Sequence, residues 1–506
     1  MALDANGRYS ESTTGAVGFI KRHGLWDDRR RAMAEEIIRS LDSVDFVRVA
    51  FGDPHGLVRS KTVSADTFRV VLRNGMDFSP GPFVFDTGHA VAVEIFAEGG
   101  GVGIAELTGA GDFILVPDPL TYRILPHTRS RTGWVLGDEY LRDGSPHPLS
   151  SRRVLLKLIA EADARDLDFV VGLEVEWYLT RFADDSRMGT VGGFGVQGSA
   201  PAVLPVNAGY QFNLDGFGDA LEPVIDPLAH ALLRLGLPLR SFEHESGPGQ
   251  LEFTFAPMTG LEAADAMLLF RTVTKQMCAR LGYHASFMAL PGIPGFDPSG
   301  WHLHQSLAVR STGRNAFVAA DDALLSELGR HYVGGLLDHA AASSILCVPT
   351  VNGYRRTQRG FALSPDRIGW AHENRGGHIR VMGASGDPAT HVENRMGEPC
   401  ANPYLYLASQ LSAGLDGIDR RLDPGDAVPD PHSGALKPLP VSLREALQSF
   451  EADGFYPEML GDHLAACLRL LKESELARYE EWLVKAGLVE PDVPTPWEHD
   501  EYFTAF

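Results

Sequence analysis

Four short segments, far apart in the chain, carry acidic and imidazole side chains at spacings suited to metal binding. They span residues 172–177, 244–252, 299–306 and 391–395. Residues i and i+2 of a β-strand point to the same face of a sheet. We therefore expect three pairs of side chains each to share one cavity: Glu174 and Glu176, His302 and His304, and Glu393 and Arg395.

The acidic residues of these segments predict a site for divalent cations. Five carboxylates in one place repel each other unless cations neutralise them. The five are Glu174, Glu176, Glu245, Glu252 and Glu393. Carboxylate oxygens with an imidazole suit Mg²⁺ or Mn²⁺ better than a metal that prefers thiolates. Sites with more than one such cation commonly handle phosphates.

A set of arginines forms a second constellation, mostly between the histidine pair and the last acidic segment. They are Arg355, Arg356, Arg359, Arg375, Arg380 and Arg395. Guanidinium groups bind carboxylate and phosphate in bidentate fashion. Metals on one side and arginines on the other would clamp a phosphoryl group during its transfer. The chain has no glycine-rich phosphate loop of the P-loop or kinase type, so ATP would be held by metals and arginines.

The composition restricts the class of protein. A chain of 506 residues with 44% hydrophobic content can bury a large core and is long enough for at least two domains. The net charge of -21 argues against nucleic acid or an anionic membrane as the main partner. The four cysteines show no C-x-x-C spacing, which is typical of reduced thiols.

Neither a signal peptide nor an apolar run long enough to span a bilayer is visible, so we expect a cytoplasmic protein.

The periodicity of apolar residues predicts an α+β chain in two domains. Residues 1–145 indicate a small sheet-rich domain, with a helix over 27–41 and strands over 44–51 and 113–119. A linker over 143–148 leads to the second domain, residues 146–506. There we expect a helix over 152–166, a strand over 169–179 and long helices over 261–281, 322–343 and 404–415. This order is not a regular βαβ repeat.

Seven segments in order resemble the glutamine synthetase family, from about Val44 to near Leu488. The matching segments are Glu174-x-Glu176, His244-Glu245 with Gly249-Gln250-x-Glu252, 299–306, 349–354, Asn374-Arg375 with Ile379-Arg380, Glu393-x-Arg395, and 401–405 leading to 413–417. The resemblance implies a small N-terminal β-grasp-like domain and a large catalytic domain with a curved antiparallel sheet flanked by helices.

The resemblance also implies a ligand set for the cations. Glu176, Glu245 and Glu252 would hold one metal ion, and Glu174, His302 and Glu393 would hold a second ion nearer the γ-phosphate of ATP. Two or three Mg²⁺ or Mn²⁺ ions per site are implied.

The substrates of the family are glutamate, ATP and a small amine. By the resemblance, His304 and Ser306 face the nucleotide, and Arg356 and Arg395 bind the substrate carboxylate. Arg375 and Arg380 contact the nucleotide and stabilise the transferring phosphoryl group. The γ-carboxylate of glutamate attacks ATP to give γ-glutamyl phosphate, and the amine then displaces phosphate.

The flap of this chain departs from the family pattern Pro-Gly-x-Glu-Ala-Pro. Residues 359–365 contain no acidic residue, so an ammonium ion would lose one carboxylate partner. Asp53 matches the other acid on the ammonium side. We infer an organic acceptor, apolar or aromatic, such as aniline or an alkylamine. Phe361, Leu363 and Trp301 would favour it.

Other interpretations stay open. The acceptor could be ammonia, a polyamine or ethanolamine, and a relative without catalysis would act as a sensor. The His-x-His pair alone also fits a metallohydrolase. Trp301 and residues 361–363 could be plain packing, Asp53 could terminate a turn, and Arg355 and Arg359 could be surface charges.

The family forms double rings, in which the N-terminal domain with Asp53 would complete the neighbouring subunit's site.

Overall fold

The computed structural model describes residues 17–184, 188–210, 212–358 and 363–506, which form two compact units. The smaller unit contains residues 17–51, 60–80 and 111–147, and the larger unit contains 52–59, 81–110 and 148–506. Two segments of the first 147 residues therefore belong to the larger unit. The expected domain boundary at residue 145 stays a prediction.

The smaller unit is a mixed sheet with short helices. Its strands follow the order β2-β1-β6-β4-β3, and β5 also pairs with β6. β1 runs parallel to β6, with Val47 opposite Gly133, whereas β4 runs antiparallel to β6. The elements are α1 (Phe19–Arg22), α2 (Asp28–Ser40), η1 (Leu41–Ser43), β1 (Phe46–Gly52), β2 (Val58–Ser64), α3 (Ala65–Asn74), β3 (Met76–Phe78), β4 (Phe113–Pro117), η4 (Pro119–Thr121), β5 (Arg123–Ile124) and β6 (Thr132–Tyr140).

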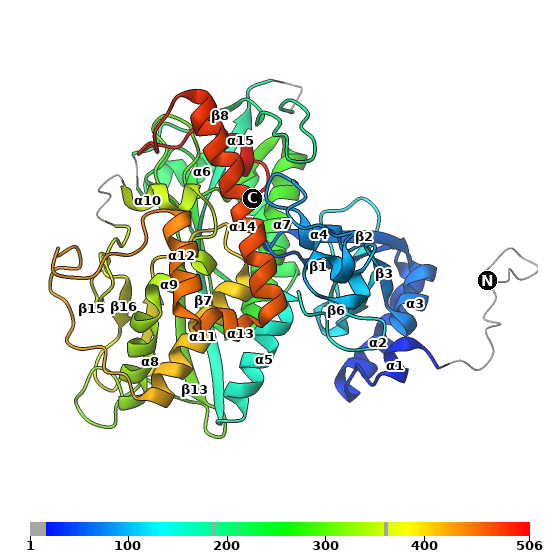
Figure 1. The fold of residues 1–506 in the computed structure, drawn as a ribbon, viewed down its shortest axis with the longest axis horizontal. Helices are drawn as coiled ribbons and strands as arrows, with labels where there is room; N and C mark the ends of the chain where they lie inside the picture. Colours follow the sequence, from blue (N-terminus) through cyan, green and yellow to red (C-terminus); the bar gives the residue numbers. More distant parts are fainter. Residues whose placement is uncertain (1–16, 185–187, 211, 359–362) are drawn as a thin grey trace, which may run out of the picture. The chain divides into compact units, whose positions relative to one another are not determined.

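The larger unit is built on one long strand, β7 (Leu167–Phe182), which lies in the middle of a curled sheet (Figure 1). The sheet has the order β15-β16-β17-β13-β7-β10-β9, and further short strands pair with β7 and β13. The remaining strands are β8 (Val203–Pro205), β9 (Leu239–His244), β10 (Gln250–Phe255), β11 (Met258–Thr259), β12 (Tyr283–Ser286), β13 (Trp301–Val309), β14 (Arg314–Asn315), β15 (Trp370–His372), β16 (Ile379–Met382) and β17 (His391–Asn394).

Helices pack on this sheet and on one another. α5 and α7 contact β7, and α11 packs against α5, α7, α8 and α9. The helices are α4 (Gly81–Val84), η2 (Glu98–Gly101), η3 (Ala105–Leu107), α5 (Ser151–Asp163), α6 (Asp215–Arg234), α7 (Gly260–Leu281), α8 (Glu327–Asp338), α9 (Ala340–Cys347), η5 (Asn352–Tyr354), α10 (Arg355–Gln358), α11 (Pro403–Arg420), α12 (Leu443–Asp453), α13 (Phe455–Leu460), α14 (Asp462–Ala486) and α15 (Pro496–Tyr502).

The predicted α+β class is confirmed, and the strongest helix and strand predictions agree with the structure. The helix predicted over 261–281 is α7, whose start is fixed by a capping box between Thr259 and Glu262. The helix predicted over 322–343 is wrong as a single element. Ser326 caps α8 at residue 327, and His339, with φ of −95° and ψ of 10°, separates α8 from α9.

Within the residues that the structure describes, no helix is both long and apolar enough to cross a membrane.

Candidate functional site

Strand register brings the predicted metal ligands together around β7. Glu252 on β10 lies opposite Glu176, and His302 on β13 lies opposite Glu174. On the other side of β13, Glu393 of β17 lies opposite His304. Directly opposed residues on neighbouring strands have their Cβ atoms about 5 Å apart, so these side chains share one face. The pairing therefore gathers side chains from four strands at one place.

Glu174 is the centre of this cluster. Its Oε1 lies 2.7 Å from Nδ1 of His302, and its Oε2 lies 2.9 Å from Nε2 of His304. Ligand atoms of Glu174, Glu252 and His302 lie within 4.8 Å of one another, as do those of Glu174, His304 and Glu393. The structure thus adds His304 to the residues that could hold a metal ion. The assignment of ligands to individual cations stays a prediction.

The acidic groups beside Glu174 have pKa values above their usual range. Burial, followed by the charge of Glu245, raises the pKa of Glu176 to about 8. Burial also raises the pKa of Glu245 to about 7. The pKa of Glu252 is raised by burial and then by repulsion from its carboxylate neighbours. Oxygen donors with a nearby imidazole, too crowded to ionise together, fit a hard divalent cation such as Mg²⁺ or Mn²⁺.

Two of the acidic groups ionise more readily because they have cationic or hydrogen-bonding partners. Burial acts to raise the pKa of Glu174, but the hydrogen bonds from His302 and His304 outweigh it, and the net pKa is lowered. Burial likewise acts against ionisation of Glu393, and the charges of His302 and Arg395 lower its pKa overall. Glu393 is fully buried and also accepts a hydrogen bond of 3.2 Å from Arg380.

The arginines beside the cluster have unused hydrogen-bond donors. Arg356 donates to the carbonyl oxygens of Met396 at 2.7 Å and Gly397 at 2.8 Å, and Arg395 donates to Glu393. In the described part of the chain, the buried Nε–H groups of Arg356, Arg380 and Arg395 have no partner. A buried unpaired donor is costly unless a ligand satisfies it, so these groups fit an anionic substrate.

The remaining predicted nucleotide and phosphoryl contacts lie near the same sheet. Ser306 is half-buried on β13, two residues from His304 and on the same face. Arg375 is exposed, and its positive charge acts to lower the pKa of Glu245, which places it close to the acidic cluster. Their roles stay predictions.

Asp53 is engaged within its own turn. Its Oδ1 accepts hydrogen bonds from the backbone amides of His55 at 3.0 Å and Leu57 at 2.9 Å. Its Oδ2 accepts one of 2.7 Å from Nε of Arg59, and the residue is 0% exposed. This carboxylate therefore stabilises the turn and is neutralised by an arginine.

The residues predicted to favour an apolar amine lie in different surroundings. Trp301 is fully buried, and its ring packs edge-on against Tyr406, with ring centroids 4.9 Å apart. Leu363 is 52% exposed. Phe361 and Arg359 lie outside the described residues. The interpretation of Arg355 as a surface charge is wrong, because it is 1% exposed and paired with Glu498.

Two residues without a predicted role contact the cluster. Nε2 of His391 lies 3.0 Å from Nδ1 of His304, and Nδ1 of His391 lies 2.6 Å from the carbonyl oxygen of Ala389. Gln250 donates to Glu176 at 3.2 Å and to the carbonyl oxygen of Pro298 at 3.0 Å. The spacing of His391, two residues before Glu393 on one strand, is the signal that could have identified it.

Comparison with known proteins gives consistent matches over most of the chain. Residues 148–488 match the family model described as glutamine synthetase, catalytic domain. A gamma-glutamylanilide synthase from Acinetobacter sp. is 41% identical, covering 96% of this chain and 99% of the relative. A glutamine synthetase from Methanosarcina mazei is 31% identical, covering 93% and 96%.

Solved structures agree with this result. The structure named "Apo GmaS without ligand" has a TM-score of 0.72 at 27% identity and covers 91% of this chain and 97% of its own. The structure named "GmaS/ADP complex-Conformation 1" has a TM-score of 0.73 at 26% identity, with coverage of 90% and 98%.

Proposed function

The chain belongs to the glutamine synthetase family and is an ATP-dependent carbon–nitrogen ligase, and we propose that its acceptor is an uncharged aromatic amine of the aniline type. The reaction joins the γ-carboxylate of glutamate to the amine through γ-glutamyl phosphate. The relative named gamma-glutamylanilide synthase supports this acceptor.

The acidic cluster would hold two or three divalent cations, Mg²⁺ or Mn²⁺. Glu174, Glu176, Glu245, Glu252, His302 and Glu393 are the proposed ligands. When bound, the cations neutralise the phosphates of ATP so that an anionic carboxylate can approach in line.

The arginines bind and orient the two anionic substrates. Arg356 and Arg395 would bind the α-carboxylate of glutamate through donors that include their unpaired Nε–H groups. Arg380 and Arg375 would stabilise the charge that develops on the transferring phosphoryl group. Arg380 is well placed for this, since it already donates to Glu393 beside the proposed cations.

The proposal of an uncharged acceptor rests on the ion pair between Asp53 and Arg59, which leaves Asp53 unavailable to bind a cationic amine. Ammonia and alkylamines are cations at neutral pH and need an anionic partner where they bind, whereas arylamines are weak bases and are neutral. The flap sequence over 359–365 supplies no acid, and the carboxylate of Asp53 is already paired with Arg59 at 2.7 Å. With no acid in the flap and Asp53 engaged, the neutral amine is favoured, because it costs less to bury than an unpaired cation.

Aniline and cyclohexylamine make a sharp test, because the two rings have similar size but only cyclohexylamine is protonated at pH 7.5. Phosphate release with ATP, Mg²⁺ and glutamate should give a kcat/KM for aniline above those for cyclohexylamine, methylamine, ethanolamine, putrescine and ammonium. Mass spectrometry would identify the amide product. Equal or higher kcat/KM for cyclohexylamine or ammonium would refute the proposed acceptor, and no turnover with any amine would point to a sensor.

We also propose the assembly of the family, a double ring with each site between neighbouring subunits. Size-exclusion chromatography with light scattering would measure the mass of the particle, and loss of activity on dilution into monomers would support a shared site. A particle of one subunit with full activity would refute it. The cytoplasmic location stays a prediction from the sequence.

A further inference from the structure

We propose that Glu498, on the C-terminal helix α15, is a positioning residue that holds the glutamate-binding side of the site in place. The inference rests on the proposed function, because Glu498 would act through Arg356. Glu498 is 0% exposed and lies far from the acidic cluster in sequence. Its carboxylate accepts hydrogen bonds from Asn352 and Arg355, two residues of one segment, and each of them leads to residues of the proposed site.

The first contact is with the helical turn α10, which carries two consecutive arginines with different partners. Arg355 donates to Glu498, from Nε at 3.2 Å and from a terminal nitrogen at 3.0 Å. Arg356, the next residue, donates to the carbonyl oxygens of Met396 and Gly397 beside Arg395. Arg355 and Arg356 are adjacent in one helical turn. The ion pair of Arg355 therefore restrains the backbone position from which the Arg356 side chain extends.

The second contact is with Asn352 in η5, which connects Glu498 to the loop that leads into β13. Asn352, which is fully buried, donates to Glu498 at 2.9 Å and to the carbonyl oxygen of Leu290 at 3.0 Å. The amide nitrogen of Leu290 donates back to Asn352 at 2.8 Å. The loop continues to Ser299 and His302, so Glu498 is linked through Asn352 to the loop before a proposed metal ligand.

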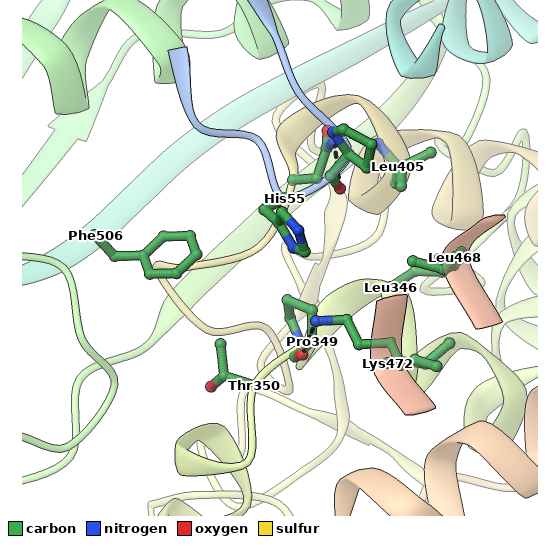
Figure 2. Close-up of a pocket in the computed structure, with 11 residues that line it drawn as sticks. His55, Leu346, Pro349, Thr350, Leu405, Leu468, Lys472 and Phe506 are labelled. Atoms are coloured by element: carbon green, nitrogen blue, oxygen red, sulfur yellow. Dashed lines mark hydrogen bonds between the residues drawn. The ribbon is translucent and has the colours of Figure 1, made fainter. Parts of the chain in front are cut away.

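Other buried contacts complete the attachment of residues 349–354. Lys472 on α14 donates to the carbonyl oxygen of Pro349 at 2.6 Å, as Figure 2 shows beside a small cavity that also contacts Phe506. Glu398 accepts hydrogen bonds from the amide nitrogen of Thr350 at 2.8 Å and from its hydroxyl at 2.9 Å. The segment is therefore held at both ends, and Glu498 binds both Asn352 and Arg355, while Glu490, Tyr479 and the carbonyl oxygen of Pro491 also accept from Arg355.

A second glutamate on α15 provides a matched control. Glu501 is also buried, and it accepts hydrogen bonds from Thr87 at 2.6 Å and from Arg478. Both glutamates therefore tie the same helix to the larger unit by charged contacts. The contacts found for Glu501 in the described chain do not include residues 349–358.

The test compares Glu498→Gln, Glu498→Asp and Glu501→Gln with the wild type. Glutamine keeps the capping box with Thr495, so α15 should still form. We expect Glu498→Gln to raise the KM for glutamate about tenfold, because a displacement of about 1 Å is enough to weaken an oriented contact. The KM for ATP should stay unchanged. Glu498→Asp, which keeps the charge, should recover part of the loss, and Glu501→Gln should keep the wild-type KM values.

Hydrogen–deuterium exchange gives a readout other than turnover. In Glu498→Gln, exchange should rise in residues 349–358 and 287–301, whereas Glu501→Gln should leave both at wild-type levels. Should Glu498→Gln fail to fold, Arg355→Lys is the alternative variant. Lysine keeps the positive charge but lacks the planar set of guanidinium donors, so we expect a higher KM for glutamate and faster exchange in residues 349–358 and 287–301. Equal KM for glutamate and equal exchange in Glu498→Gln and Glu501→Gln would overturn the positioning role alone. A wild type that never turns over glutamate would overturn the proposed function and this inference with it.

Discussion

Replacing Glu176 by glutamine should stabilise the metal-free protein and destabilise the metal-loaded one relative to wild type. The side chain accepts hydrogen bonds from the amide of Gly300 at 2.8 Å and from Gln250 at 3.2 Å, and a glutamine oxygen can accept both. The substitution therefore removes mainly a charge. Burial and the nearby Glu245 raise the pKa of Glu176 from 4.5 to about 8.

The size and sign of the effect follow from proton linkage. The folded-state pKa of Glu176 lies above the unfolded-state value, so the folding penalty is absent below about pH 4.5. It grows as the pH rises towards 8 and is constant above that value. At pH 7, folding must protonate a carboxylate that is ionised in the unfolded chain. This costs about 1 to 3 kcal/mol at 1.36 kcal/mol per pH unit, the lower end allowing for solvent access.

Metal binding should reverse the order of stability. A cation at about 100 times its Kd stabilises the folded wild type by about 2.7 kcal/mol. The glutamine variant has lost one proposed ligand and gains less. The sign of the stability difference between variant and wild type should thus change between EDTA and Mn²⁺.

Urea denaturation followed by tryptophan fluorescence measures these differences, in EDTA and in Mn²⁺, at pH 6 and pH 8. Glu243→Gln is the control, because Glu243 lies opposite Glu252 in the ladder of β9 and β10 but is not a proposed ligand. That control should keep the stabilisation by Mn²⁺. The reasoning is refuted if Glu176→Gln is less stable than wild type in EDTA at pH 8, or if Mn²⁺ stabilises it as much as wild type.

Three further substitutions test other parts of the site. His302→Ala should raise the Mn²⁺ concentration for half-maximal activity about tenfold or more, because Glu174 loses a partner at 2.7 Å; an unchanged metal titration would contradict this. Arg356→Lys should raise the KM for glutamate about tenfold, because lysine lacks the paired N–H donors with which a guanidinium binds a carboxylate. A change in the KM for ATP instead would place Arg356 at the nucleotide. Leu363→Glu supplies the acid that the flap lacks and should shift the kcat/KM ratio of cyclohexylamine to aniline upward. Leu363→Gln is its neutral control, and equal ratios in the two variants would count against a flap role for this residue.

The parts of the site that sequence could predict are those set by local periodicity. The alternation along β7 places Glu174 and Glu176 on one face, and it was readable because apolar residues occupy the positions between them. The capping box of Thr259 and Glu262 likewise marks the start of α7. In such cases the signal lies within a few residues of the element itself.

The parts that sequence could not predict depend on partners far away in the chain. Arg355 looks like an ordinary surface charge until Glu498, 143 residues later, is brought against it. Asp53 looks available for a substrate until Arg59 is seen to pair with it. The break at His339 also has no glycine or proline beside it to announce it, and its imidazole lies between Asp416 and Asp453 in the fold.

The alternation of β7 also limits how the gene can change. Odd-numbered positions from Leu167 to Trp177 are buried, and Glu174 and Glu176 occupy the intervening even ones. An in-frame loss of a single codon within β7 upstream of Glu174 would turn both acids towards the other face and put Val175 and Trp177 in their places. Point substitutions can adjust this enzyme gradually, but a change in the length of its central strand would exchange the two sides of the sheet in one step.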